Sequence, residues 1–507
     1  MSQSDIHRGH KIARNTLILY VRMLFLMFVG LYTSRIVLAA LGESDFGIYG
    51  VVGGVVSLFT IISGSLSSAI TRFITYELGK ERGALADVFS SAVTIQIALA
   101  LLVAAVAEPL GIWFINNQMN IPADRLTAAH WVFQFSLLTF VINIISIPYN
   151  ASIVAHEKMS AFAVIGIFEG LAKLAVAFVI LYSSSDRLVL YGILMCAVAL
   201  AVRFAYTLYC RKHFSECRYR FIWNAELLKQ MFSFAGWNFI GVSAGALRDH
   251  GGNILINIFS GPAVNAARAV SVQLGGAVQS FVTNFMTAVN PQITKSYAAE
   301  DREYTMNLVF RSSRYSFFLL LLIAMPVMLQ TPYLLELWLG DVPERSAAFV
   351  RLALLFSLSE AVSGPLVTLM LATGSIRKYQ IIVGGLQLMN LPVSYMVLRY
   401  GAAPECILLV SIVISQCCLF ARLILLKGMT GLDVLRFIRQ VYAKVLMVTA
   451  VAFIPCWWLS SLMGYGMLPF IGSCSVSLLV TSVVTWLFGL SRDERSLLLN
   501  KLRRKGV

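Results

Sequence analysis

The chain has 507 residues, of which 58% are hydrophobic and only 13% are charged, and its mean hydropathy is +0.77. A soluble domain of this length would carry about twice that share of charged residues, so the composition excludes an ordinary soluble enzyme or binding domain. The formal net charge of +15 comes from basic residues in short loops beside apolar segments, which indicates a membrane topology signal and not a nucleic-acid surface.

About fourteen apolar segments follow one another along the chain, and each is long enough to cross a bilayer, which takes about 20 residues. Each is expected to be a helix, because an isolated strand cannot satisfy its backbone hydrogen bonds in lipid. The first segment lacks a small-residue cleavage site and is interpreted as a signal anchor. The sequence therefore predicts an all-α polytopic membrane protein. The expected spans are 13–40, 46–75, 87–115, 127–154, 160–183, 188–210, 228–259, 263–294, 305–331, 346–373, 379–398, 403–427, 438–461 and 465–489.

The Lys and Arg residues of the loops fall almost entirely on one side of the predicted membrane. The basic side includes Arg14, Lys158, Arg314, Arg422 and the tail Arg492–Lys505. The other side carries only Arg125, Arg187, Arg345 and Arg399. By the positive-inside rule, the basic side is cytoplasmic. The even number of spans puts both termini on that same side.

An internal repeat relates the second predicted span to the eighth. Each follows a long helix and a short outer turn that contains a glycine, Gly42 in the first half and Gly261 in the second. Each carries small and polar residues spaced by three or four, which lie on one helix face; helix packing explains such a stripe as well as a pore lining does. Because six spans separate the repeats, the two halves are parallel, as in transporters whose halves rock around a central site.

The expected organisation has four parts, and the longest charged loop separates the two halves. The parts are an N-terminal lobe at 1–212, a cytoplasmic linker at 213–227, a C-terminal lobe at 228–430, and two further spans with a basic tail at 431–507.

Charged residues remain inside the predicted spans. A charge at the centre of a bilayer costs about 2.5–3.5 kcal/mol, so several of them indicate a hydrated cavity or close ion pairs. Snorkelling to the membrane surface is sufficient to explain Arg72 and Arg351, and Glu169 and Lys173 can neutralise each other at a spacing of four residues. The intramembrane charges are Arg22, Arg35, Arg72, Lys173, Arg203, Arg248, Arg268 and Arg351, opposed by Glu169, Asp249 and Glu360.

Four arginines are the best candidates for lining a cavity. Arg22 lies roughly 13 Å along its helix, Arg248 follows a Gly-x-x-x-Gly spacing that permits close helix approach, and Arg35 and Arg268 lie at corresponding depths in the two halves. Excess guanidinium favours an anionic ligand, because its planar fork of donors binds phosphate oxygens bidentately. Pairing within the protein is the alternative for all four.

The remaining candidates are weaker. Arg72 and Gln279, on the two repeat helices, are secondary candidates for the cavity. The candidates for coupling transport to H⁺, Na⁺ or the membrane potential are Glu169, Lys173, Asp249, Glu360 and His250. No cofactor or metal is expected, because the eight cysteines form no C-x-x-C and no two histidines have metal-ligand spacing.

Several segments resemble the polysaccharide transporters of the multidrug/oligosaccharidyl-lipid/polysaccharide (MOP) superfamily, in particular the Wzx-type O-antigen and exopolysaccharide flippases. The likeness is specific in the first, second, seventh and eighth spans and elsewhere rests mainly on hydropathy. The segments that carry it are Asn15-Thr16-Leu17, Ser34 to Gly42, Phe46 to Gly50, Ser67 to Phe73, Gly261 to Arg268, and Asn290 to Ile293.

The resemblance implies two six-helix lobes that form a V and expose a central cavity to each side in turn. It implies a transporter, not an enzyme, in the bacterial inner membrane. The implied cargo is an undecaprenyl-diphosphate-linked oligosaccharide, moved from the cytoplasmic to the periplasmic leaflet, with membrane lipids and a polysaccharide polymerase as candidate partners. Cavity arginines of the family attract the diphosphate, and the best matches by position are Arg22, Arg35, Arg248 and Arg268, although no family motif surrounds Arg248.

Three alternatives stay open. A lipid II flippase for peptidoglycan has a similar fold. A cation-coupled exporter of small molecules is disfavoured, because the first span lacks the membrane aspartate of many drug-extruding relatives. A membrane glycosyltransferase or polymerase is also disfavoured, since the longest outer loop, 332–345, offers no carboxylate pair suited to acid–base catalysis; its Glu336, Asp341 and Glu344 are interpreted as solvated charges.

Overall fold

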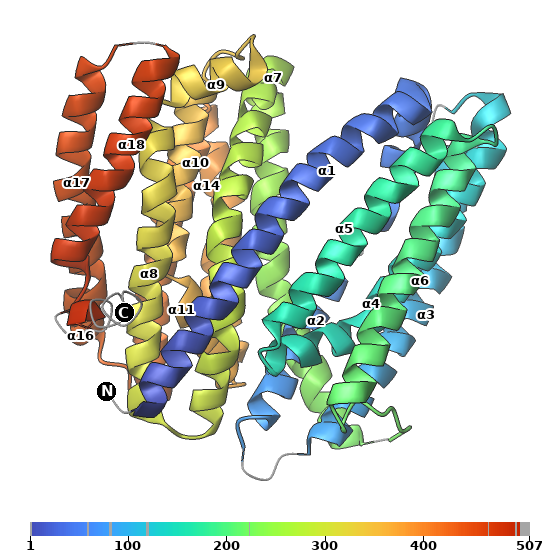
Figure 1. The fold of residues 1–507 in the computed structure, drawn as a ribbon, viewed down its shortest axis with the longest axis horizontal. Coiled ribbons are helices and arrows are strands. Elements are labelled where there is room, and N and C mark those ends of the chain that lie inside the picture. The colour runs from blue at the N-terminus through green and yellow to red at the C-terminus, as the bar shows by residue number, and fades with distance from the viewer. Residues whose placement is uncertain are drawn as a thin grey trace, which may run out of the picture. The chain divides into compact units, whose positions relative to one another are not determined.

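The computed structural model describes residues 3–57, 60–80, 84–117, 121–222, 224–464, 466–491 and 494–496. These residues are helical apart from short connections, and no strand occurs among them (Figure 1). Eleven helical segments are long and apolar enough to cross a membrane. The predicted all-α polytopic membrane protein is therefore confirmed.

The three other expected spans are also helical where the structure describes them. The segment 46–75 runs through the end of α1 (Gln3–Ser57) and into α2 (Thr60–Glu77). The segments 228–259 and 263–294 are the two parts of α7 (Ala225–Ala298), which bends at Gly261. Polar residues such as Arg248 and Arg268 make these parts less apolar than the eleven.

The chain divides into two compact units. Unit 1 comprises Met1–Val242 and Thr294–Glu300, and unit 2 comprises Ser243–Ile293 and Asp301–Val507. Each unit has its own buried core, so each is described separately.

Unit 1 is built around α4. This helix packs against α3 and α6, while α1 packs against α5. The ring of Phe133 is fully buried and fills the space left by Gly111, where a Cβ would lie 2.1 Å from that ring. Besides α1 and α2, unit 1 contains the two ends of α7 and the helices α3 (Leu85–Asn117), η1 (Ala123–Arg125), α4 (Leu126–Ala155), α5 (Met159–Tyr182) and α6 (Arg187–His213).

Unit 2 packs its last two long helices against α8, as Figure 1 shows for α17 and α18. The amide of Gln330, at the end of α8, donates hydrogen bonds to Ser460 Oγ at 2.7 Å and Ser473 Oγ at 2.9 Å. The helices that follow α7 are α8 (Arg302–Leu329), α9 (Thr331–Leu339), α10 (Ser346–Ala361), α11 (Gly364–Ala372), α12 (Arg377–Tyr379), η2 (Gln380–Gly384), α13 (Gly385–Leu388), α14 (Asn390–Arg399), α15 (Cys406–Thr430), α16 (Val434–Phe437), η3 (Ile438–Tyr442), α17 (Ala443–Leu462), α18 (Met467–Val484) and η4 (Thr485–Gly489).

Two loop assignments from the sequence are wrong. The outer loop expected at 332–345 begins as helix α9, because Pro332 lies in the first turn, where a helix tolerates proline. Arg314 and Arg422, counted among the cytoplasmic loop charges although they fall within the expected spans 305–331 and 403–427, lie inside α8 and α15 and are 5% and 2% exposed. Arg314 is accommodated because its Nη2 pairs with Glu494 at 2.7 Å.

The turns expected around Gly42 and Gly261 have almost the same backbone geometry. Gly42 has φ 75° and ψ 171° within α1, and Gly261 has φ 81° and ψ 178° within α7. Residues with a side chain hardly ever adopt this conformation. The two glycine turns that the predicted internal repeat pairs with each other are thus alike in backbone conformation.

Substitution of either glycine is expected to destabilise the protein. Gly42→Ala or Gly261→Ala forces a Cβ into a conformation that costs about 1–3 kcal/mol, although no atom lies within 4 Å of either Cβ position. Both variants should unfold at a lower temperature in detergent. Gly47→Ala is the matched control, since Gly47 has equally open surroundings and helical backbone. An unchanged unfolding temperature in all three variants would contradict the expectation.

Candidate functional site

Arg268 lies just after the bend of α7 and is the most deeply buried of the predicted cavity arginines, at 4% exposure. Its Nε donates to Asn253 Oδ1 at 2.6 Å, and its Nη2 donates to the carbonyl oxygen of Asp249 at 3.3 Å. Its Nη1 is buried and has no hydrogen-bond partner among the described residues. The guanidinium is therefore fixed on two sides and keeps one donor for a ligand.

Gly252 makes room for this guanidinium. A Cβ at position 252 would lie 2.7 Å from Arg268 Nη2, too close for any side chain to fit without a shift. The two parts of α7 approach each other here through the smallest residue available, which explains the run Gly251-Gly252-Asn253 in the sequence.

Arg248 lies beside this arrangement in unit 2. Its Nε pairs with Asp249 Oδ1 at 2.9 Å, and its guanidinium carbon lies 4.7 Å from the centre of the Phe356 ring. The side chain of Asp249 remains 60% exposed. Arg248, Asp249 and Arg268 therefore lie together within unit 2, with both guanidinium groups near the carboxylate of Asp249.

Glu360 reaches the same region from α10. It lines a small pocket of about 10 Å³ together with Arg248 and Phe356, which has room for about one water molecule at most. Its Oε1 accepts a short hydrogen bond from Ser415 Oγ on α15. Gln279 does not belong to this cluster, because it follows Arg268 by eleven residues, roughly 16 Å along α7; its buried Oε1 has no hydrogen-bond partner among the described residues.

Arg22 is the corresponding arginine of unit 1. Its guanidinium carbon lies 4.4 Å from the centre of the Phe162 ring, a cation–π contact. A Cβ at Gly166 would lie 2.3 Å from Arg22 Nε, so α1 and α5 approach closely at this glycine. Arg22 Nε is buried and without a hydrogen-bond partner among the described residues. Arg22 thus resembles Arg268 in having an unused donor.

The other predicted residues of unit 1 differ in their surroundings. Glu169 and Lys173 form the expected pair on α5, at 2.6 Å. Arg72 is half-buried, with its guanidinium 4.5 Å from the centre of the Tyr76 ring and 5.6 Å from that of Phe234, so aromatic rings hold it. Arg35 is exposed, and the described residues offer it no ion pair.

Sequence reasoning missed the residues that position these arginines. Asn253, Phe356, Phe162 and Gly166 each contact one of them. The polar segment that ends in Asn253 could have indicated that this asparagine contacts a buried charge. The aromatic residues gave no signal, because 32 phenylalanines are spread along the chain.

This architecture of long apolar helices is that of a multi-pass membrane protein, and solved transporter structures share the fold. A MATE transporter in its bent conformation has a TM-score of 0.74 and 11% identity, with 85% of this chain and 99% of that chain covered. An outward-facing multidrug resistance MATE transporter of the MOP superfamily has a TM-score of 0.70 and 12% identity, covering 85% and 98%. A MOP superfamily transporter from Pyrococcus furiosus, described as having a binding pocket of reverse polarity, has a TM-score of 0.66 and 12% identity, covering 83% and 96%. These identities show the fold alone.

The family is shown by a sequence model described as "Polysaccharide biosynthesis protein", which matches residues 12–297, more than half of the chain. The chain belongs to this family, as its resemblance to polysaccharide proteins predicted, and it shares its fold with a solved transporter of the MOP superfamily. It is a multi-pass membrane protein whose fold is shared with solved MATE transporters. A comparison with curated proteins finds no match.

Proposed function

We propose that this transporter is a flippase for a lipid-linked oligosaccharide. Its cargo is a glycan on undecaprenyl diphosphate, moved by alternating access from the cytoplasmic to the periplasmic leaflet of the bacterial inner membrane, with both termini in the cytoplasm. The observation that carries the proposal is the buried guanidinium of Arg268, which is oriented by Asn253 and retains an unused donor. The oxygen atoms of a diphosphate would accept a hydrogen bond from this donor.

The charge at the site favours an anion over a cationic drug. Within unit 2, the guanidinium groups of Arg248, Arg268 and the buried Arg422 outnumber the carboxylates of Asp249 and Glu360. A guanidinium in low-dielectric surroundings attracts phosphate oxygens more strongly than it would in water. Arg35, Arg72 and Gln279 are proposed to contact the cargo more weakly. Arg35 is exposed, and Arg72 is already surrounded by aromatic rings.

The transport step needs a driving force, and Glu360 is the best candidate for coupling to H⁺ or Na⁺. Its carboxylate is half-buried and bonded to the neutral hydroxyl of Ser415. Glu169 and Asp249 are less suitable, because Lys173 and Arg248 already neutralise them. A polysaccharide polymerase is the proposed partner that receives the flipped glycan.

A deletion strain tests the proposal. We expect the strain to lose a surface polysaccharide and to accumulate the lipid-linked glycan on the cytoplasmic side of the membrane. It should grow normally when a second mutation blocks the synthesis of that glycan before the transport step. Lysis with loss of peptidoglycan synthesis would instead identify a lipid II flippase. Sensitivity to small-molecule drugs with an intact surface glycan would identify a cation-coupled exporter.

A further inference from the structure

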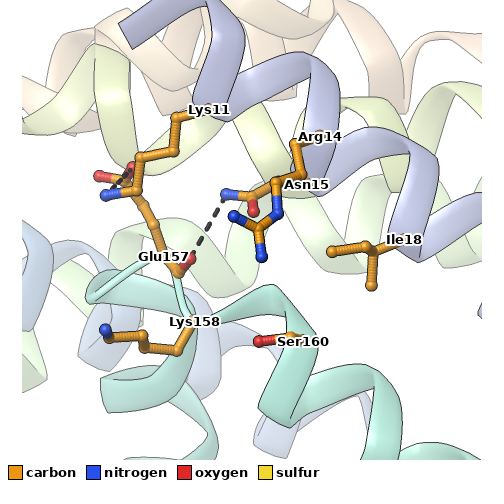
Figure 2. A pocket seen from close by; sticks show the side chains of 7 residues that line it. All are labelled: Lys11, Arg14, Asn15, Ile18, Glu157, Lys158 and Ser160. Carbon is orange, nitrogen blue, oxygen red and sulfur yellow. Dashed lines mark hydrogen bonds and ion pairs between the residues drawn. The ribbon is translucent and has the colours of Figure 1, made fainter. Parts of the chain in front are cut away.

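Unit 1 contains a basic pocket that the proposed function does not use. The pocket has a volume of about 380 Å³ and lies between the beginning of α1 and the turn that joins α4 to α5 (Figure 2). It is separate from the Arg22 site, because Arg14 precedes Arg22 by eight residues, roughly 12 Å along the helix. The lining residues are Lys11, Arg14, Asn15, Ile18, Glu157, Lys158 and Ser160.

The single carboxylate in this pocket is already neutralised. Glu157 pairs with Lys11 Nζ at 2.9 Å and with Lys295 Nζ at 2.8 Å. Arg14 and Lys158 form no ion pair with any described residue, and Figure 2 shows the Arg14 guanidinium in the space between α1 and the α4–α5 turn. The pocket therefore carries uncompensated positive charge with no protein anion to occupy it.

The backbone reinforces this charge. The 24-residue helix α5 begins at Met159, on the wall of the pocket, and the residue before it, Lys158, provides no side-chain cap. The first turn of a helix presents unpaired N–H groups and a partial positive charge. The hydroxyl of Ser160 faces the same space (Figure 2). Arg14, Lys158, Ser160 and this helix end form a set of donors that suits a phosphate group.

An apolar stripe leads away from the pocket along α1. Ile18 lines the pocket, and Val21 and Phe28 follow Arg14 on the same helix face at spacings of seven and fourteen residues. Val21 and Phe28 are 59% and 68% exposed. A cationic pocket at one end of an exposed apolar stripe matches a molecule with an anionic head and a hydrocarbon tail, whereas free phosphate would need no stripe.

We propose that this pocket binds the phosphate group of a membrane lipid, with Arg14 and Lys158 as its ligands and the lipid chain along the Ile18–Phe28 face of α1. Any lipid with an accessible phosphate fits, so the proposal does not depend on the identity of the transported glycan. It adds an anion site at the membrane surface to the arginines placed deeper in the spans.

The test measures lipid binding to the full-length protein in detergent by native mass spectrometry. The probes are phosphatidylglycerol, phosphatidylcholine with the same chains, and inorganic phosphate. The double variant Arg14→Gln/Lys158→Gln should weaken phosphatidylglycerol binding about tenfold or more, as expected for the loss of charge-assisted hydrogen bonds. The wild type should prefer phosphatidylglycerol to phosphatidylcholine, whose choline offsets the phosphate charge.

Arg211→Gln/Lys212→Gln is the matched control, because it removes two exposed positive charges at the end of α6 in the same unit without touching the pocket. Its binding should stay within about twofold of the wild type. The charge-retaining variant Arg14→Lys/Lys158→Arg should bind well and shows whether the positions tolerate substitution. Equal losses in the pocket and control variants would overturn the proposal. Displacement of the lipid by inorganic phosphate at equal concentration would overturn the lipid as the occupant.

Discussion

Replacement of Arg268 by alanine is expected to abolish export of the proposed cargo while the protein still reaches the membrane. The guanidinium is 4% exposed, is oriented by Asn253 and Asp249, and offers its remaining Nη1 donor. Truncation of one partner of a buried, hydrogen-bonded charge pair typically costs about 2–5 kcal/mol, and each 1.4 kcal/mol is about tenfold in affinity. Transport should therefore fall by about thirtyfold or more. The measurement is surface glycan in a deletion strain that expresses the variant.

Two further variants separate a role in transport from a role in folding. Arg268→Lys keeps the charge but loses the planar fork that bonds Asn253 and a phosphate together, so we expect intermediate export. Arg351→Ala is the matched control, because Arg351 also belongs to a membrane helix of unit 2, is exposed, and bonds the carbonyl oxygen of Met328 at 3.0 Å. It should export normally. Normal export by Arg268→Ala would remove Arg268 from the proposed site.

The helices and their outer turns could be predicted because the signals are local in sequence. Apolar length predicted the spans, and a short turn was expected at Gly42 and at Gly261, where the structure has breaks in helical geometry within α1 and α7. The spacing of four residues between Glu169 and Lys173 predicted their ion pair at 2.6 Å. In each case, the interacting groups lie within one helix or one turn, where sequence spacing fixes distance.

Contacts between distant segments could not be predicted in the same way. Arg314 is paired with Glu494, 180 residues away, and nothing close to Arg314 in the sequence indicates this partner. Arg14 and Lys158 counted only as topology signals until the fold brought both to one pocket. The orientation of Arg268 by Asn253 likewise depends on the bend at Gly261, which reverses the direction of α7. The sequence identified the positively charged residues, but it did not identify the residues that contact them.

Glu157→Gln is expected to destabilise the contacts within unit 1 that join the start of α1, the α4–α5 turn and the segment 294–300. Glu157 is 4% exposed and joins the start of α1, through Lys11, to the segment 294–300, through Lys295. Removal of one partner from a buried ion pair costs about 3–5 kcal/mol, because Lys295 would be left buried without its counterion. The variant should therefore unfold at a lower temperature, measured by thermal unfolding in detergent.

The pH dependence gives a second measurement of the same cluster. Burial alone would raise the pKa of Glu157, but Lys295 and Lys11 outweigh it and hold that pKa below its ordinary value. A depressed carboxylate pKa means that the stabilisation is complete above the unfolded-state pKa, about 4.3, and is lost as the pH falls through the folded-state pKa. The difference between wild type and Glu157→Gln should thus be constant near neutral pH and shrink only in strong acid. Glu77→Gln is the control, because its partner Lys80 is 41% exposed and such a pair contributes at most about 1 kcal/mol. An equal loss of stability in both variants would show that Glu157 does not join these segments.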